Sequence, residues 1–111
     1  MISAWKSAVI ASGGTLSAEV DLGKDYKRVL VIAPTIDSAT INVKVATASG
    51  GTYYSMYILD ADATGSFLHA TTAGTGAIAV TFDIGGAQYV KILVGTAQSS
   101  GAVTFLVRGI D

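Results

Sequence analysis

Residues 40–45 read TINVKV, and apolar and polar side chains alternate along all six positions. The three aliphatic side chains would lie on one side of the chain, and Thr40, Asn42 and Lys44 on the other. A period of two is typical of a half-buried β-strand, because successive side chains of a strand point to opposite faces of its sheet. A helix would need apolar residues three and four positions apart, and no stretch of this chain sustains that spacing. The segment therefore predicts β structure.

The same alternation recurs in TLSAEVDL (15–22) and AIAVTF (77–82). Glycines, Pro34 and Ser-Gly clusters separate the apolar runs, and such residues favour turns. Strands that are apolar on both faces lie centrally in a covered sheet or at a contact between subunits. Together the runs predict an all-β domain of about eight short antiparallel strands, either a β-sandwich or a small barrel. The runs that are apolar on both sides are 28–33, 53–59, 89–94 and 103–107.

The length and the composition predict one domain with a partner. A chain of 111 residues fits a single packed core, so we expect one domain over residues 1–111, with the first 12 or so residues forming an arm or an edge strand. Only 14% of the residues are charged, whereas 50% are hydrophobic; a soluble domain typically has about 25% charged residues. Obligate interfaces are poor in Lys, Glu and Asp. We therefore expect part of the surface to be buried in a homo-oligomer, although small neutral residues alone could also cover it.

Several classes of partner are not expected. The seven basic and eight acidic residues are scattered and give a net charge of −1, so no basic patch predicts nucleic-acid binding. The chain has no cysteine, which excludes disulfides and thiolate metal sites. No apolar stretch reaches the 18 or so residues of a membrane span. The N-terminal apolar run is too short for a signal peptide, so we expect synthesis in the cytoplasm of a host cell.

The stretch DADATG (60–65) resembles the first half of a calcium loop. Asp60, Asp62 and Thr64 occupy alternate positions before Gly65, but the twelfth position is Thr71, which cannot supply a bidentate carboxylate. Asp side chains also bond their own backbone in turns that need no metal. We predict a turn between two strands, with a weak cation site at Asp60 and Asp62 as the open alternative, and we expect no metal or cofactor.

Catalytic groups are not indicated by the sequence. His69 is the only histidine, so no second imidazole could complete a zinc site. No nucleophile elbow marks a catalytic serine. We predict that the protein is not an enzyme and has no catalytic residues.

The aromatic residues are the better candidates for binding. Tyr53, Tyr54 and Tyr57 fall within five residues of one another, and Trp5 lies near the N-terminus. In an alternating strand, Tyr53 and Tyr57 would share one face, and one set of side chains would pack in the core. The other set could contact a protein or stack on a sugar ring, because Tyr and Trp dominate binding hot spots. The candidate protein–protein interface residues are Ile2, Trp5, Tyr53, Tyr54, Met56 and Tyr57.

Residues 38–65, SATINVKVATASGGTYYSMYILDADATG, and residues 86–109, GAQYVKILVGTAQSSGAVTFLVRG, together resemble small β-sandwich proteins of tailed bacteriophages. Those proteins share a SATI-type strand, a GGTYY turn and strand, an acidic turn, an aromatic strand with VKI, and a closing strand that ends in Arg. The resemblance spans about two-thirds of the chain. The loop at 95–102, GTAQSSGA, is shorter than in many of those proteins.

The resemblance implies a jelly-roll-like β-sandwich on the phage particle, typically a capsid decoration (cement) protein. It implies no catalytic residues. We expect a structural protein of the virion that sits on the capsid surface, binds the major capsid protein and forms a homotrimer. The alternative is a carbohydrate-binding or receptor-binding module of a phage fibre or baseplate, in which the tyrosines stack on a glycan.

Overall fold

The computed structural model describes residues 2–59, 66–68 and 70–111, and in this part every element is a β-strand. All the strand pairs are antiparallel, so the predicted all-β class and the antiparallel pairing are confirmed. Within the described ranges no helix is long and apolar enough to cross a membrane. The strands are β1 (Lys6–Ile10), β2 (Val20–Ala46), β3 (Tyr54–Ser55), β4 (Tyr57–Leu59), β5 (Ser66–Leu68), β6 (Ala70–Val94) and β7 (Val103–Ile110).

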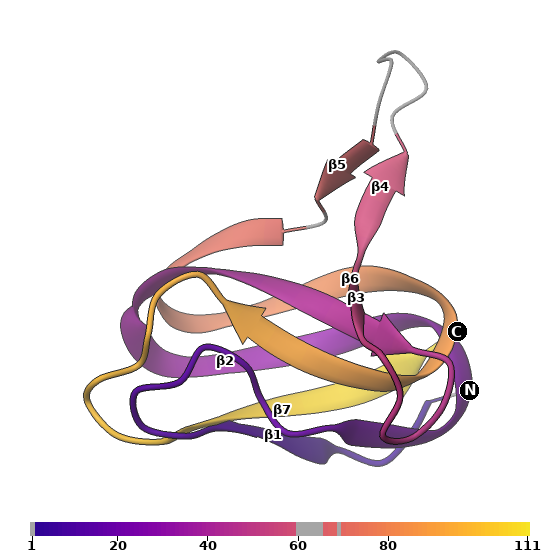
Figure 1. Ribbon diagram of the computed structural model, residues 1–111, viewed down its shortest axis with the longest axis horizontal. Coiled ribbons are helices and arrows are strands. Elements are labelled where there is room, and N and C mark those ends of the chain that lie inside the picture. The colour runs from indigo at the N-terminus through magenta and orange to yellow at the C-terminus, as the bar shows by residue number, and fades with distance from the viewer. Residues whose placement is uncertain (1, 60–65, 69) are drawn as a thin grey trace.

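The strands form one five-stranded sheet and a separate two-stranded one. The large sheet has the order β1-β7-β2-β3, with β6 paired to β2 as well. The middle of β2 lies between β7 and β6, because Val31 pairs with both Val107 and Val80. β4 and β5 pair only with each other in the described chain, and they stand away from the large sheet (Figure 1).

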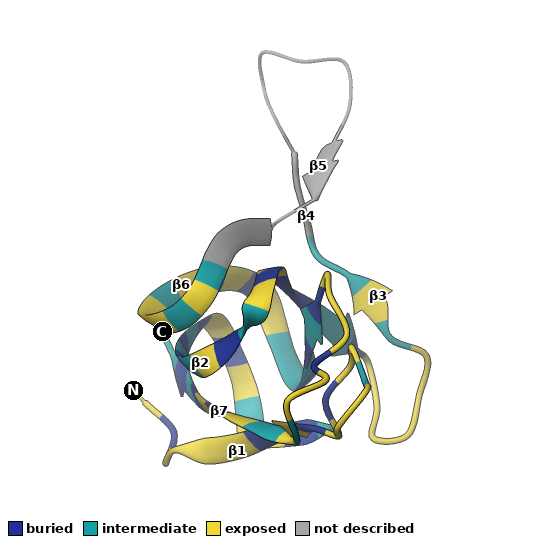
Figure 2. Ribbon diagram, turned by 90° about the vertical axis from the view of Figure 1, so that its left-hand side faces the viewer, coloured by how far each residue is buried: buried dark blue, intermediate teal, exposed yellow. Residues whose placement is uncertain are grey.

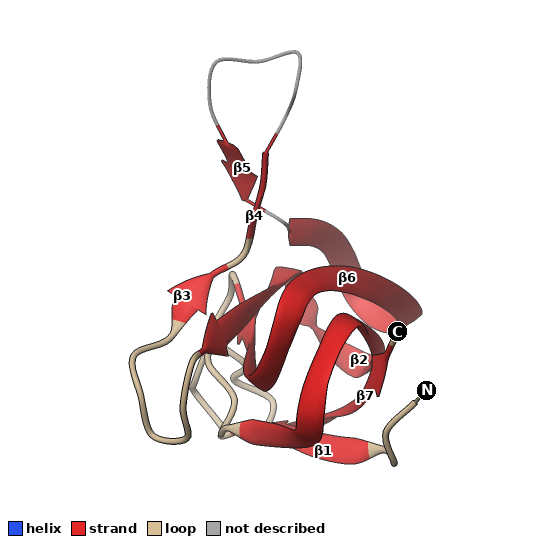
Figure 3. Cartoon of the chain, turned by 90° about the vertical axis from the view of Figure 1, so that its right-hand side faces the viewer, coloured by secondary structure: helices blue, strands red, loops and turns tan. Residues whose placement is uncertain are grey.

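β2 and β6 form a long ribbon that curls back on itself (Figure 3). Val90 of β6 is the Cα partner of both Val20 and Val45, so the two ends of β2 flank the same end of β6. The sheet is therefore curled into a half-barrel. The two stacked sheets of a jelly-roll sandwich are not confirmed.

The prediction of about eight short strands is wrong in one respect, because β2 has 27 residues and β6 has 25. The turn signals inside these strands bend them without reversing the chain. Gly85 and Gly86 have φ of 64° and 93° within β6, a left-handed conformation that glycine tolerates. Near Gly23 the register of β2 shifts, and the Asp21 carboxylate accepts the Gly23 N–H at 2.8 Å.

Among the residues whose burial is described, one hydrophobic core lies inside the curl (Figure 2). The predicted strand at 40–45 contributes Ile41 and Val43, which are almost fully buried, but Asn42, predicted to lie on the polar face, is buried as well. The prediction for 15–22 is wrong at its start, because Leu16 is exposed and Ser17 is buried instead. The Ser17 hydroxyl accepts the Ile92 N–H at 2.8 Å, and this bond turns the polar side chain inward.

Both termini lie beside the same end of β7 (Figure 1). Ile2 forms an isolated antiparallel bridge with Ile110, and the Ser3 hydroxyl accepts the Gly109 N–H at 2.8 Å. β1 then pairs with β7 at one end of the strand order. This arrangement brings Trp5 against the last residues of the chain.

Candidate functional site

One face of the sheet formed by β1, β7 and β2 carries apolar side chains away from the core. Phe105 and Val107 of β7 are fully buried, so the intervening Leu106 and Arg108 point to the opposite side. Leu106 pairs with Ile32, and Arg108 pairs with Leu30. We call this surface the outer sheet face; its apolar residues are Ile2, Trp5, Val9, Leu30, Ile32, Leu106 and Ile110, Arg108 lies beside Trp5, and the exposed polar residues Ser7 and Thr104 lie among them.

Several large apolar side chains of the outer sheet face are exposed to solvent. Trp5 is 39% exposed, Val9 and Leu106 are 41% exposed, and Ile2 is 59% exposed. Leu30 and Ile32 are partly buried by their neighbours. The structure thus places both predicted N-terminal residues, Ile2 and Trp5, on one exposed apolar surface.

Trp5 and Arg108 form the centre of this surface. The Arg108 guanidinium lies 4.4 Å from the centroid of the Trp5 ring, well within the range of a cation–π contact. The Nε of Arg108 is buried and has no hydrogen-bond partner in the described chain. Trp and Arg are the residue types most enriched in binding hot spots. Sequence reasoning missed Arg108 because 103 positions separate it from Trp5.

Tyr53 is held inside a hydrogen-bonded cluster on Glu19. The Tyr53 hydroxyl donates to Glu19 Oε1 at 2.5 Å, the Ser49 hydroxyl donates to Oε2 at 2.6 Å, and the Gly50 N–H donates to Oε1 at 2.9 Å. The Lys91 ammonium lies 4.6 Å from the centroid of the Tyr53 ring. Tyr53 therefore anchors the loop at 47–53 to the sheet.

The same contacts shift two pKa values in opposite directions. The hydrogen bond from Ser49, followed by those from Tyr53 and Gly50, lowers the pKa of Glu19 to about 2. Burial of the Tyr53 hydroxyl, together with its bond to ionised Glu19, raises the pKa of Tyr53. The cluster therefore holds a carboxylate and a neutral phenol across the neutral pH range.

Tyr54 is the exposed member of the predicted tyrosine cluster. It pairs with Val45 in the short β3 and is 63% exposed. The predicted single strand at 53–59 is interrupted at Met56, which is partly buried and donates its N–H to the Val43 carbonyl at 3.0 Å. The predicted alternation of faces therefore does not extend through Met56. The side chain of Tyr57 lies outside the described part of the structure.

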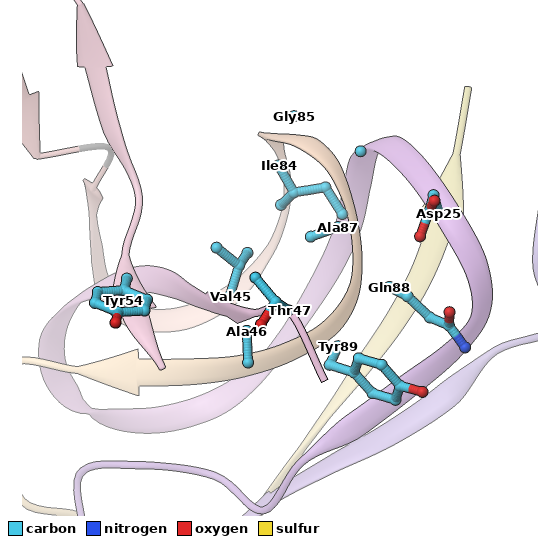
Figure 4. Close-up of a pocket in the computed structure, with 11 residues that line it drawn as sticks. Asp25, Val45, Ala46, Thr47, Tyr54, Ile84, Gly85, Ala87, Gln88 and Tyr89 are labelled. Carbon is cyan, nitrogen blue, oxygen red and sulfur yellow. The ribbon is translucent and has the colours of Figure 1, made fainter. Parts of the chain in front are cut away.

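Tyr54 borders a cavity of about 390 Å³ between the end of β2 and the glycine bend of β6 (Figure 4). Gln88 lies in its wall, and one N–H of its amide donates to Asp21 Oδ1 at 2.9 Å. Sequence reasoning did not find this cavity, because the bend at Gly85 and Gly86 creates it. We call it the Tyr54 cavity; its described lining residues are Asp25, Val45, Ala46, Thr47, Tyr54, Ile84, Gly85, Gly86, Ala87, Gln88 and Tyr89.

A buried glutamine joins three loops elsewhere in the molecule. Gln98 is 1% exposed, and its backbone bonds Gly13 and Gly14. Its side-chain Oε1 accepts the Asp37 N–H at 2.8 Å, while Nε2 donates to the carbonyls of Asp37 at 3.3 Å and Thr96 at 3.0 Å. The Asp37 carboxylate accepts further bonds from Ser99 and Ser100. This cluster therefore ties the loops around residues 13–14, 37 and 96–100 to one another.

The sequence offered three candidates for metal binding or catalysis, Asp60, Asp62 and His69. All three lie outside the residues that the structure describes. Among the residues that the structure describes, no group of three or more His, Cys, Asp or Glu side chains could hold a metal ion.

The described chain is thus an all-β protein whose antiparallel strands form a curled sheet. The chain is similar to the solved structure of the SPBc2 prophage-derived protein YomS, with a TM-score of 0.54, 15% identity, and coverage of 100% of this chain and 98% of that one. This likeness extends over both chains and shows a shared fold. No protein family and no curated protein matches the sequence.

Two further likenesses concern carbohydrate-active proteins. A family 89 glycoside hydrolase from Clostridium perfringens has a TM-score of 0.50 at 15% identity, and the match covers 95% of this chain but 14% of that one. Chitosan-binding module 1 of a chitosanase/glucanase from Paenibacillus sp. IK-5 gives a lower TM-score of 0.49 at 20% identity, covering 92% of this chain and 75% of that one. The hydrolase match is thus confined to a small part of a much larger enzyme.

Proposed function

We propose that this protein is a structural component of a bacteriophage particle, a decoration protein that binds the capsid shell through its outer sheet face. The observation that carries the proposal is the exposed apolar surface centred on Trp5 and Arg108. The full-length likeness in fold to a prophage-derived protein supports it. β2 curls so that its two ends flank Val90 of β6, and this curl supports a jelly-roll-like arrangement of the kind the sequence resemblance implies.

The free energy that this face can supply on binding is small, so we expect several copies of the face to bind together. Burying a large apolar side chain completely is worth about 1.5–3 kcal/mol. Trp5, Val9 and Leu106 are already about 60% buried, so covering the remainder, with Ile2, would supply roughly 3–4 kcal/mol. Association costs about 4–15 kcal/mol in lost freedom. One face alone therefore binds weakly, whereas a homotrimer that presents three faces to the major capsid protein multiplies the effect.

The experiment is co-sedimentation with shells assembled from the major capsid protein of the same genome. We expect the wild-type chain to pellet with the shells and Trp5→Ser to remain in the supernatant. Leu16→Ser is the matched control, because Leu16 is similarly exposed at 37% but lies outside the outer sheet face. Equal pelleting of Trp5→Ser and the wild type, or no pelleting of either, would contradict the proposal. Multi-angle light scattering tests the trimer separately.

A second candidate function, carbohydrate binding, is favoured by the exposed Tyr54 at the edge of a cavity. An aromatic ring that is exposed beside a concave surface with polar groups is the usual form of a small-ligand site. In this function the protein would be a receptor-binding module of a fibre or baseplate. A glycan array probed with the wild type and with Tyr54→Ala tests it, since sugar binding that depends on Tyr54 would favour this candidate over the capsid.

A further inference from the structure

We infer that the Tyr54 cavity takes a pyranose ring that is amino-bearing or uncharged, and that it discriminates against acidic sugars. The inference rests on the second proposed function and adds the ligand class and the residues that select it. The cavity volume of about 390 Å³ falls within the range of about 300–1,000 Å³ that small-molecule sites occupy. The space is therefore sufficient for a small ligand.

The apolar end of the site is Tyr54. Its ring is 63% exposed, and a phenol ring presents a flat apolar surface together with a polar tip. A pyranose ring has a comparable face of C–H groups, with hydroxyls around its rim. Stacking the two covers apolar surface on both partners and leaves the hydroxyls free for hydrogen bonds.

Contacts of the neighbouring residues hold the backbone of Tyr54 in place. Tyr53, the preceding residue, is fixed by its bond to Glu19 and by the Lys91 ammonium over its ring. On the other side, the β3 pairing holds the Tyr54 backbone opposite Val45. A preorganised side chain loses less conformational freedom when a ligand binds. The backbone of Tyr54 is thus held on both sides, by the anchored Tyr53 and by the pairing with Val45.

The polar end of the site is formed by Asp25 and Gln88, and Figure 4 shows Tyr54 at one end of the cavity and Asp25 at the other. Gln88 uses one amide N–H on Asp21, which leaves its carbonyl oxygen and its second N–H for a ligand. The Asp25 side chain is exposed, so its carboxylate is accessible to a ligand. These groups suit the hydroxyls of a sugar.

The charge of the lining selects among sugars. Asp25 is the only charged residue among the described residues that line the cavity, and no Lys or Arg joins it there. A carboxylate attracts an ammonium group and repels a second carboxylate. The order of affinity is therefore amino sugar first, neutral sugar second, and acidic sugar last.

The test is an NMR titration of the ¹⁵N-labelled chain with glucosamine, glucose and glucuronic acid as separate probes. We expect glucosamine to bind about two- to fivefold more tightly than glucose, the factor that one exposed ion pair supplies. Glucuronic acid should bind more weakly than both. Asp25→Asn should remove the preference for glucosamine and keep glucose binding.

Tyr54→Ala should weaken all binding at least tenfold, whereas Tyr54→Phe should retain it because the ring remains. Trp5→Ala is the matched control, since it removes an exposed aromatic ring that lies on the outer sheet face. If no probe binds, carbohydrate binding fails altogether. If sugars bind but Asp25→Asn leaves the preference unchanged, or Tyr54→Ala binds like the wild type, this inference alone is overturned.

Discussion

Replacing Gln98 by Leu should destabilise the fold by about 2–3 kcal/mol. The side chain is 1% exposed and makes three hydrogen bonds to the backbone of Asp37 and Thr96. Leucine is of similar size but leaves one N–H and two carbonyls without their partner. Each such group costs about 1–3 kcal/mol when buried, and the low end applies because the Asp37 segment is partly open to water.

The assay is urea unfolding followed by circular dichroism, with thermal melts in parallel. A loss of this size should lower Tm by about 10 °C, given roughly 4 °C per kcal/mol for a domain of this length. The backbone bonds of Gln98 to Gly13 and Gly14 survive the substitution, so we expect the variant to fold.

Gln88→Leu is the matched control, because it removes a single exposed bond to Asp21 and should change stability by less than about 0.5 kcal/mol. If Gln98→Leu were as stable as Gln88→Leu, the buried amide would not be what joins the three loops. The reasoning from unpaired backbone groups would then be refuted for this site.

Three further substitutions test other parts of the fold. Gly109→Ala should cost about 1–3 kcal/mol in urea unfolding, because its Cβ would lie 2.3 Å from the buried Tyr26 ring; adding Tyr26→Leu should recover part of the loss, and strict additivity would contradict the clash. Hydrogen bonds, led by that from Ser49, lower the pKa of Glu19 from 4.5 to about 2, so its ionised form adds stability above pH 4.5 that is lost as the pH falls towards 2. The Tm difference between wild type and Glu19→Gln should shrink across that window, and a difference that is constant from pH 7 to 2 would refute the assignment. Asn42→Leu should raise stability by about 1 kcal/mol, since the buried amide has no hydrogen-bond partner in the described chain; a lower Tm would show that the amide is satisfied.

The fold class was predictable because the two-residue period is a property of strand geometry. Ile41 and Val43 are buried as their alternation requires. The strand lengths were not predictable, because a glycine can either reverse a strand or bend it. Gly85 and Gly86 bend β6 through their positive φ, and the residues after them pair with both ends of β2. That pairing is long-range, and no local pattern encodes it.

The candidate surfaces were predictable in kind but not in detail. An excess of apolar over charged residues implies exposed apolar side chains, and Ile2 and Trp5 are indeed exposed. The environment of each aromatic depends on distant residues, however. Tyr53 is anchored by Glu19, which lies 34 positions earlier, whereas Tyr54 has no such partner among the described residues and stays 63% exposed. Adjacent, identical residues thus acquire different roles through contacts that spacing does not show.

The two proposed surfaces involve different residues, and this separation makes each testable without the other. The outer sheet face is formed from β1, β7 and the middle of β2, whereas the Tyr54 cavity is formed from β3, the bend of β6 and other parts of β2. Neither Trp5 nor Tyr54 belongs to the buried core cluster, so truncating either leaves the packing within that cluster intact. A loss of shell binding in Trp5→Ser with sugar binding intact would therefore separate attachment to the particle from recognition of a glycan, whereas a loss of both activities in one variant would indicate global damage.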